Sequence, residues 1–233
     1  MDANVSIAGQ WITKELVVIR YLEGDWISLF FALYSTLVVE IHAVYVTLFL
    51  WNRDLLTTYC CSTHLVSEII SYCLKRYLKH DRPIDAPGGG TGFLEGKYGM
   101  PSQHCHCFAY LGTMILLLVY HYYRSATTKR WRAFCLVSVI IGVAIQIAAR
   151  VYLNYHTLTQ CFSGVALGLF NATLFYLAGL VLLRYFADSL CDLALLKVLN
   201  FRKDLSTLTH VKPITKAEKA ARRMREALKQ HRS

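Results

Sequence analysis

The chain has 233 residues, of which 55% are hydrophobic, and its mean hydropathy is +0.36. A soluble domain of this length would not contain several apolar runs long enough to cross a bilayer, so the composition favours a membrane protein. The formal net charge of +10 is concentrated beside the apolar runs and near the C-terminus. This distribution suits membrane orientation and anionic lipid headgroups better than nucleic acid.

Apolar segments recur along the chain and predict an all-α, polytopic membrane helix bundle with about five transmembrane spans. The spans are expected at about residues 26–51, 55–78, 104–123, 134–153 and 157–186. Trp26 and Trp51 would lie at the two membrane interfaces of the first span. The second span is the weakest because it carries His64 and Glu68. The chain would thus divide into an N-terminal segment (1–25), a membrane core (26–186) and a basic tail (187–233).

The first 25 residues mix both charges and lack the pattern of a cleaved signal peptide, so we expect them to be retained. The flanking lysines and arginines predict the orientation. Arg53, the basic cluster at 124–132 and the tail would be cytosolic. The N-terminal segment, the loop after the second span and the turn around Asn154 would face the lumen or the exterior. A glycan at Asn4, within the sequon Asn4-Val5-Ser6, would support this orientation.

The tail has a helical pattern of its own. Thr215 and Glu218 match a capping box, and an alanine-rich apolar stripe follows them. We interpret the tail as a basic helix on the cytosolic membrane face, where it would contact anionic lipids. A solvated helix without a partner is an equally open alternative.

The eight cysteines fall almost entirely within apolar segments, so no disulfide framework is predicted. The run His104-Cys105-His106-Cys107 contains residue types that bind metals. However, adjacent residues on a helix point in different directions, and no second ligand pair follows at zinc-like spacing. We therefore expect no metal site and no cofactor.

Lys75, Arg82 and Arg150 are the cations expected to bind a phosphate group. Arginine offers a planar fork of donors to phosphate oxygens, and lysine adds a mobile point charge. Several converging cations are needed because a phosphate ester must lose much of its negative charge before a nucleophile approaches. Alternatively, each residue only flanks a span and extends towards the headgroups.

His104 and His156 are the candidate reactive pair. One imidazole can act as a nucleophile while the other donates a proton, and each of these residues opens an apolar span at its lumenal end. Ser102 lies just before a helix start, where its hydroxyl and nearby amides can hold an anion. His42 and His64 lack such neighbours and are expected to form bonds within the bundle.

Three motifs in this order carry a resemblance to a known family. Lys75 with Arg82-Pro83, the run 101–104 (Pro-Ser-Gln-His), and Arg150 followed by His156 resemble the motifs of the type 2 phosphatidic acid phosphatase superfamily. The runs at 97–102 (KYGMPS) and 150–157 (RVYLNYHT) look like its dolichyl diphosphate phosphatase branch. The resemblance extends from the second to the fifth span.

The resemblance implies a metal-independent reaction through a phosphohistidine. His156 would be the nucleophile and His104 the acid that protonates the leaving group. Lys75, Arg82 and Arg150 would bind the phosphoryl oxygens, with help from Ser102. Water would then hydrolyse the phosphohistidine.

Two positions depart from the superfamily pattern, in which Ser precedes the third-motif Arg and Asp follows the nucleophile by four residues. This chain has Ala149 and Gln160 there. An amide can orient the imidazole of His156 but supports its positive charge less well than a carboxylate. The dolichyl branch also resembles this chain in having Gln. Glu68 could compensate by pairing with Lys75 or supporting a catalytic group, or it could bond only to His64.

These features predict a phosphatase that hydrolyses dolichyl diphosphate to dolichyl phosphate and phosphate at the lumenal face of the endoplasmic reticulum. It would recycle the lipid carrier for protein N-glycosylation. A phosphatase for phosphatidate or sphingoid phosphate is one alternative, and a non-catalytic lipid-binding scaffold is another.

Overall fold

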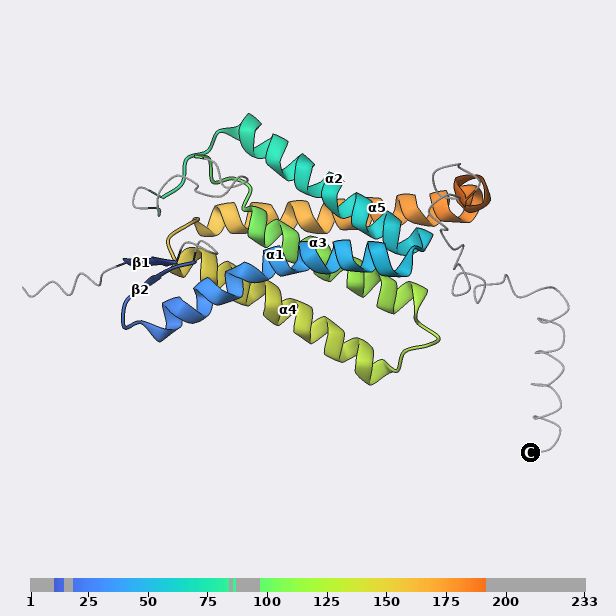
Figure 1. Ribbon diagram of the computed structural model, residues 1–233, viewed down its shortest axis with the longest axis horizontal. Coiled ribbons are helices and arrows are strands. Elements are labelled where there is room, and N and C mark those ends of the chain that lie inside the picture. The colour runs from blue at the N-terminus through green and yellow to red at the C-terminus, as the bar shows by residue number, and fades with distance from the viewer. Residues whose placement is uncertain (1–10, 15–18, 84–85, 87–96, 192–233) are drawn as a thin grey trace, which may run out of the picture.

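In the part of the chain that the structure describes, five long helices form a bundle with a small β-hairpin at its N-terminal side (Figure 1). The structure is a computed structural model and describes residues 11–14, 19–83, 86 and 97–191. The helices are α1 (Trp26–Asn52), α2 (Leu55–Leu78), α3 (Gln103–Leu117), α4 (Lys129–Tyr152) and α5 (Leu158–Cys191). A π-helical turn, η1 (Leu118–Tyr122), continues α3. The all-α prediction is confirmed, and the helix bounds lie close to the predicted spans.

Side-chain caps explain where three helices begin. Asp25 accepts hydrogen bonds from the amides of Ile27 and Ser28 at the start of α1, and Asp54 accepts one from Thr57 at the start of α2. α4 begins at Lys129, five residues before the predicted Phe134, because Thr128 caps the helix. Such caps satisfy amide groups that have no partner inside the helix.

Four stretches of the described residues are long and apolar enough to cross a membrane. They are Trp26–Asn52, Gln103–His121, Lys129–Tyr152 and Leu158–Leu183. α2 has the length but lower hydropathy, because it carries polar residues that it buries inside the bundle. Among these are His64, Ser67, Glu68 and Lys75, while Ile69 on the opposite face is exposed. This outward apolar face is what a helix in lipid needs.

α3 is the central helix and contacts each of the other four. Its closest partner is α5, where two glycines permit the approach. A Cβ atom at Gly164 would overlap the backbone of Ser102, and one at Gly168 would lie 2.6 Å from the carbonyl oxygen of His106. The Gly164/Gly168 pair therefore serves packing inside the bundle.

The hairpin was not predicted from the sequence. β1 (Trp11–Lys14) and β2 (Ile19–Leu22) pair antiparallel, and β2 contacts the start of α1. The hairpin is tied to the helices through Ser28, whose hydroxyl accepts a hydrogen bond from the amide of Leu22 at 2.8 Å.

Several sequence predictions concern parts of the chain outside the described residues. These are the sequon at Asn4, most of the glycine-rich loop before Lys97, and the basic tail from residue 192 onwards.

Candidate active site

The predicted site residues come from helix ends that gather at one end of the bundle, on the left in Figure 1. The C-terminal ends of α2 and α4 supply Lys75 and Arg150, and Ser102 is the N-cap residue of α3. His156 lies in the short connection between α4 and α5. Residues separated by about 80 positions in the chain are thus brought to one place.

The α4–α5 connection turns back on the end of α4 and places His156. The amides of Tyr155 and His156 both donate to the carbonyl oxygen of Arg150, at 3.0 and 3.2 Å. Asn154 adopts a left-handed conformation with φ of 57°, which asparagine tolerates better than most residues. As a result, His156 is buried against the bundle, with 2% of its surface exposed.

Burial and nearby positive charges both act on the pKa of His156. Burial lowers its pKa well below the ordinary value, and the positive charges of Arg150, Arg82 and Lys75 lower it further, followed by a smaller contribution from His104. Each of these effects disfavours a positive charge on the imidazole. The structure therefore brings the three predicted cations and both predicted histidines into one cluster, in which His156 is neutral.

Tyr155 helps to fix two of the cations. The guanidinium carbon of Arg150 lies 4.0 Å from the centroid of the Tyr155 ring, so the two planar groups stack closely. Nη1 of Arg82 lies 3.5 Å from the carbonyl oxygen of the same tyrosine. Arg150 and Lys75 are both only 2% exposed. Tyr155 was not singled out in the sequence, because an aromatic residue beside a helix end gives no specific signal.

Gln160 holds the imidazole of His156 in one tautomer. Its Nε2 atom donates to the carbonyl oxygen of Asp81 at 2.7 Å and lies 3.0 Å from Nδ1 of His80. Its Oε1 atom accepts from the amide of Thr157 and lies 3.2 Å from Nδ1 of His156. Because a carbonyl oxygen only accepts, Asp81 fixes which way the amide faces. Nδ1 of His156 therefore carries the proton, and Nε2 has the free lone pair.

The segment before α3 packs directly on Gln160. The amide of Ser102 donates to the carbonyl oxygen of Gln160 at 3.0 Å, and Ser102 is fully buried. A Cβ atom at Gly99 would lie 2.5 Å from the side-chain oxygen of Gln160, so this position leaves no room for a side chain. The peptide bond between Met100 and Pro101 is cis. His104, the second residue of α3, is half-buried.

Glu68 lies deeper in the bundle, in a buried polar network behind the site. Its carboxylate accepts from Nε2 of Gln103 and from Nδ1 of His106, the latter at 3.2 Å. It also lies 3.9 Å from Nε2 of His64, the partner that was expected as an alternative. The hydroxyl of Ser67 lies 2.9 Å from Nε2 of His106. Neither His106 nor Gln103 was given a role from the sequence, since their partner lies on another helix.

One further group of ligand-type side chains lies away from this site. Among the described residues, His42, His64 and Cys107 lie close enough together to hold a metal ion. None of these residues belongs to the cluster around His156.

Comparisons with known proteins find a matching family and several named relatives. The profile of the PAP2 superfamily matches residues 55–182. The chain is 26% identical over 174 residues to the human protein named Dolichyldiphosphatase 1, which covers 72% of each chain. It is 29% identical over 163 residues to the Dictyostelium discoideum protein of that name, covering 70% of this chain and 69% of the relative.

A solved structure shares the fold. The transmembrane PAP2-type phosphatidylglycerolphosphate phosphatase of Bacillus subtilis superposes with a TM-score of 0.55 at 16% identity, over 70% of this chain and 81% of the other. At this identity the likeness concerns the fold alone. The superfamily profile, by contrast, covers more than half of the chain, including all the residues of the cluster around His156. The chain therefore belongs to the PAP2 superfamily, the type 2 phosphatidic acid phosphatases, and is a multi-pass membrane phosphatase.

Proposed function

We propose that the chain hydrolyses dolichyl diphosphate to dolichyl phosphate and phosphate at the lumenal face of the endoplasmic reticulum. The product would return to the pool of lipid carrier used for protein N-glycosylation. The observation that carries the proposal is the convergence of Lys75, Arg82 and Arg150 on a neutral, buried His156. The dolichyldiphosphatase names of the relatives support the choice of substrate.

In this mechanism the nucleophile is Nε2 of His156. Its lone pair attacks the terminal phosphorus, while Gln160 retains the proton on Nδ1. The bond between that phosphorus and the bridging oxygen breaks, which leaves a phosphohistidine. Lys75, Arg82 and Arg150 bind the phosphoryl oxygens, where charge is redistributed in the transition state, and Ser102 assists from the start of α3.

His104 acts as the general acid. It protonates the bridging oxygen as dolichyl phosphate leaves, and it then accepts a proton from the water that attacks the phosphohistidine. The second step releases phosphate and restores both imidazoles to their starting state. The half-buried position of His104 suits this role, because the proton donor for the leaving group must also be reached by water.

Gln160 and Glu68 would support the reaction from different positions. Gln160 orients His156 directly. Glu68 binds Gln103, the residue between Ser102 and His104, and so would hold the first turn of α3 in place. We place Glu68 as a positioning residue rather than as a group that touches the substrate.

A long isoprenoid suits this architecture. The outer faces of the helices are apolar, with exposed side chains such as Phe30, Val39, Ile140, Phe170 and Leu177. A lipid tail can therefore stay in the bilayer while its diphosphate enters the polar end of the bundle.

We further propose the orientation and division predicted from the sequence. The N-terminal segment (1–25) and the site would face the lumen, the membrane core (26–186) would span the bilayer, and the tail (187–233) would lie in the cytosol against anionic lipids. Glycosylation at Asn4, or at a sequon inserted at residues 88–92, would support a lumenal site. Glycosylation of a sequon fused after Ser233 would contradict it.

The activity is tested by measuring phosphate release from purified protein in lipid nanodiscs. We expect dolichyl diphosphate to be cleaved and His156→Ala to abolish release, whereas His121→Ala, in η1 beyond the far end of α3, should remain active. An alkaline quench should preserve phosphate on the peptide that contains His156, because phosphohistidine is labile to acid. Release that persists in His156→Ala would refute the mechanism.

The same assay separates the alternatives. Faster hydrolysis of phosphatidate or a sphingoid phosphate than of dolichyl diphosphate would indicate a different lipid substrate. The scaffold alternative rests on Ala149 and Gln160, and it predicts lipid binding with no release of phosphate from any of these lipids.

A further inference from the structure

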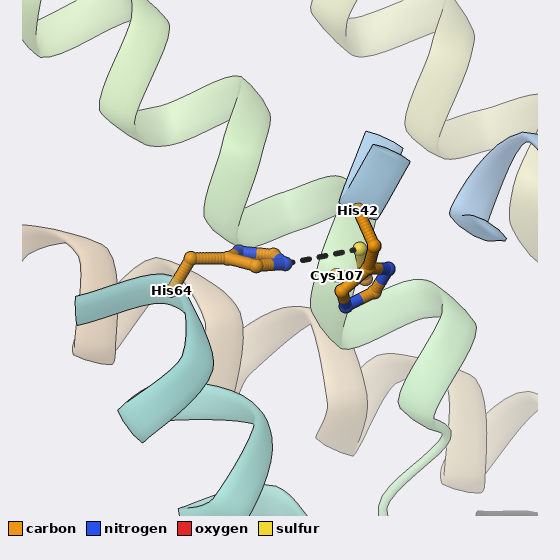
Figure 2. Close-up of side chains that lie close together, drawn as sticks. All are labelled: His42, His64 and Cys107. Atoms are coloured by element: carbon orange, nitrogen blue, oxygen red, sulfur yellow. Dashed lines mark hydrogen bonds between the residues drawn. The ribbon is translucent and has the colours of Figure 1, made fainter. Parts of the chain in front are cut away.

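Three ligand-type side chains from three helices meet inside the bundle, as Figure 2 shows. His42 comes from α1, His64 from α2 and Cys107 from α3, and we call them the His/His/Cys cluster. Their ligand atoms all lie within 4.8 Å of one another. His64 and Cys107 are fully buried, and His42 is half-buried.

His64 has few hydrogen bonds for a buried imidazole. It is 1% exposed, yet its Nδ1 atom has no hydrogen-bond partner among the residues that the structure describes. Its Nε2 atom points at Sγ of Cys107 across 3.8 Å, which is a weak contact for a thiol. An ion bound between Nε2 and Sγ would replace this weak contact with two strong bonds and leave the ring proton on Nδ1.

His42 is already oriented as a ligand would be. Its Nδ1 atom lies 2.6 Å from the carbonyl oxygen of Val38, and because a carbonyl only accepts, Nδ1 carries the proton. The lone pair is therefore on Nε2. Histidines that bind metals are commonly held in this way, by a hydrogen bond from the other ring nitrogen to a backbone carbonyl or a carboxylate.

We propose that the His/His/Cys cluster binds one Zn²⁺ ion. Two imidazoles and a thiolate are typical zinc ligands, with bond lengths of about 2.0 Å to nitrogen and about 2.3 Å to sulfur. Tetrahedral geometry then places neighbouring ligand atoms ~3.5 Å apart. The observed 3.8 Å between His64 and Cys107 is close to this value, and side-chain rotation can shorten the longest separation.

Charge balance favours a divalent ion at this depth. Zinc binding replaces the thiol proton of Cys107, which is released to water, and leaves a thiolate with one negative charge. Oε1 of Glu68 lies 3.9 Å from Nε2 of His64 and supplies a second negative charge beside the cluster. Two negative charges neutralise Zn²⁺, which removes most of the cost of placing an ion in a medium of low dielectric constant.

The zinc ion would have a structural role. His64 lies eleven residues before Lys75 on α2, which corresponds to ~16 Å along the helix axis. The ion is thus too far from the phosphate site to touch a bound phosphate. It would instead connect α1, α2 and α3, the central helix that carries Ser102 and His104.

The expectation of no metal site rested on ligand pairs that lie close together in the chain. The cluster uses one residue from each of three helices, and of the run 104–107 it takes only Cys107. Cys107 and His106 point to different partners, as expected for adjacent residues on a helix.

The test is the zinc content of the full chain, purified without a polyhistidine tag, exchanged into zinc-containing buffer and then freed of excess metal. We expect one zinc ion per chain, and X-ray absorption should show one sulfur and at least two nitrogen ligands. Cys107→Ser and His42→Gln should each weaken zinc binding by about tenfold or more. Cys135→Ser and His121→Gln, which change the same residue types away from the cluster, should bind zinc like the wild type.

Thermal unfolding provides a second measurement. A strong chelator should lower the Tm of the wild type and of both control variants, and it should leave the Tm of Cys107→Ser unchanged. The proposal is overturned if the wild type retains no zinc, if Cys107→Ser and His42→Gln retain it fully, or if the absorption spectrum shows no sulfur ligand. Retention of copper in place of zinc would overturn the assignment of the ion.

Discussion

Nδ1 of His156 lies 3.2 Å from Oε1 of Gln160, an uncharged amide at the position where the superfamily pattern has a carboxylate. The amide cannot turn over, because its nitrogen donates to the carbonyl oxygen of Asp81. Gln160 therefore selects the tautomer of His156 without stabilising its protonated form. Burial and the nearby cations then keep the pKa of His156 low.

Gln160→Asp should move the acid limb of the pH profile upwards. The rate constant kcat/KM falls when His156 of the free enzyme takes up a proton, and in the wild type this happens well below pH ~6.5. A carboxylate at this position would stabilise the protonated imidazole and raise its pKa by about one unit or more. The pH dependence of kcat/KM measures this shift.

Gln160→Asn is the matched control, since it shortens the side chain equally and adds no charge. It should lower kcat/KM without moving the acid limb. If both variants show the wild-type acid limb, the titration that limits activity belongs to a group other than His156.

Arg150→Lys should reduce kcat/KM by about tenfold to a hundredfold although the charge is kept. Lysine has no planar guanidinium group to stack on the ring of Tyr155, and it lacks the paired donors that fit two phosphate oxygens. Arg76→Lys is the control, because Arg76 also lies over a tyrosine, Tyr72, but on the exposed face of α2. Equal effects of the two changes on phosphate release would contradict a specific role for Arg150.

Local patterns allowed much of the fold to be predicted. α2 spans Leu55–Leu78 as expected, because its start is marked by Asp54 and its apolar outer face is continuous. The contact between His156 and Gln160 also follows from spacing, since the two residues are separated by four positions. By contrast, the hairpin was missed because two four-residue strands are too short to give a clear periodic signal.

Contacts between distant helices could not be predicted in the same way. The orientation of Gln160 depends on the backbone of Asp81, which lies 79 residues earlier. The partners named for Glu68 from the sequence, Lys75 and His64, lie on its own helix, and its role in supporting a catalytic group named no residue. Its hydrogen-bond partners, Gln103 and His106, belong to α3. A helical pattern specifies which face is buried but not which residue of another helix it meets.

Glu68→Gln should destabilise the protein by about 1–3 kcal/mol without changing the shape of the pH profile. The substitution keeps the volume but removes the charge that holds Gln103 and His106. Because these partners lie behind the site, the titration of His156 should not respond. Unfolding in denaturant measures the stability, and a displaced acid limb would instead assign Glu68 to the catalytic machinery.

Gly164→Ala should both destabilise the bundle and slow the reaction. The added methyl group would overlap the backbone carbonyl of Ser102, which cannot move without shifting the first turn of α3. Overpacking of this kind costs about 1–3 kcal/mol, and here it also displaces His104 from the phosphate site. Gly142→Ala is the control, because its nearest contact is the hydroxyl of Tyr34 at 3.3 Å, which donates to the carbonyl oxygen of Gly142 and needs to move by only a few tenths of an ångström. The Tm of thermal unfolding and kcat should therefore both decrease in Gly164→Ala and change little in Gly142→Ala. A stable Gly164→Ala protein with wild-type kcat would show that α3 and α5 need not approach so closely for the site to form.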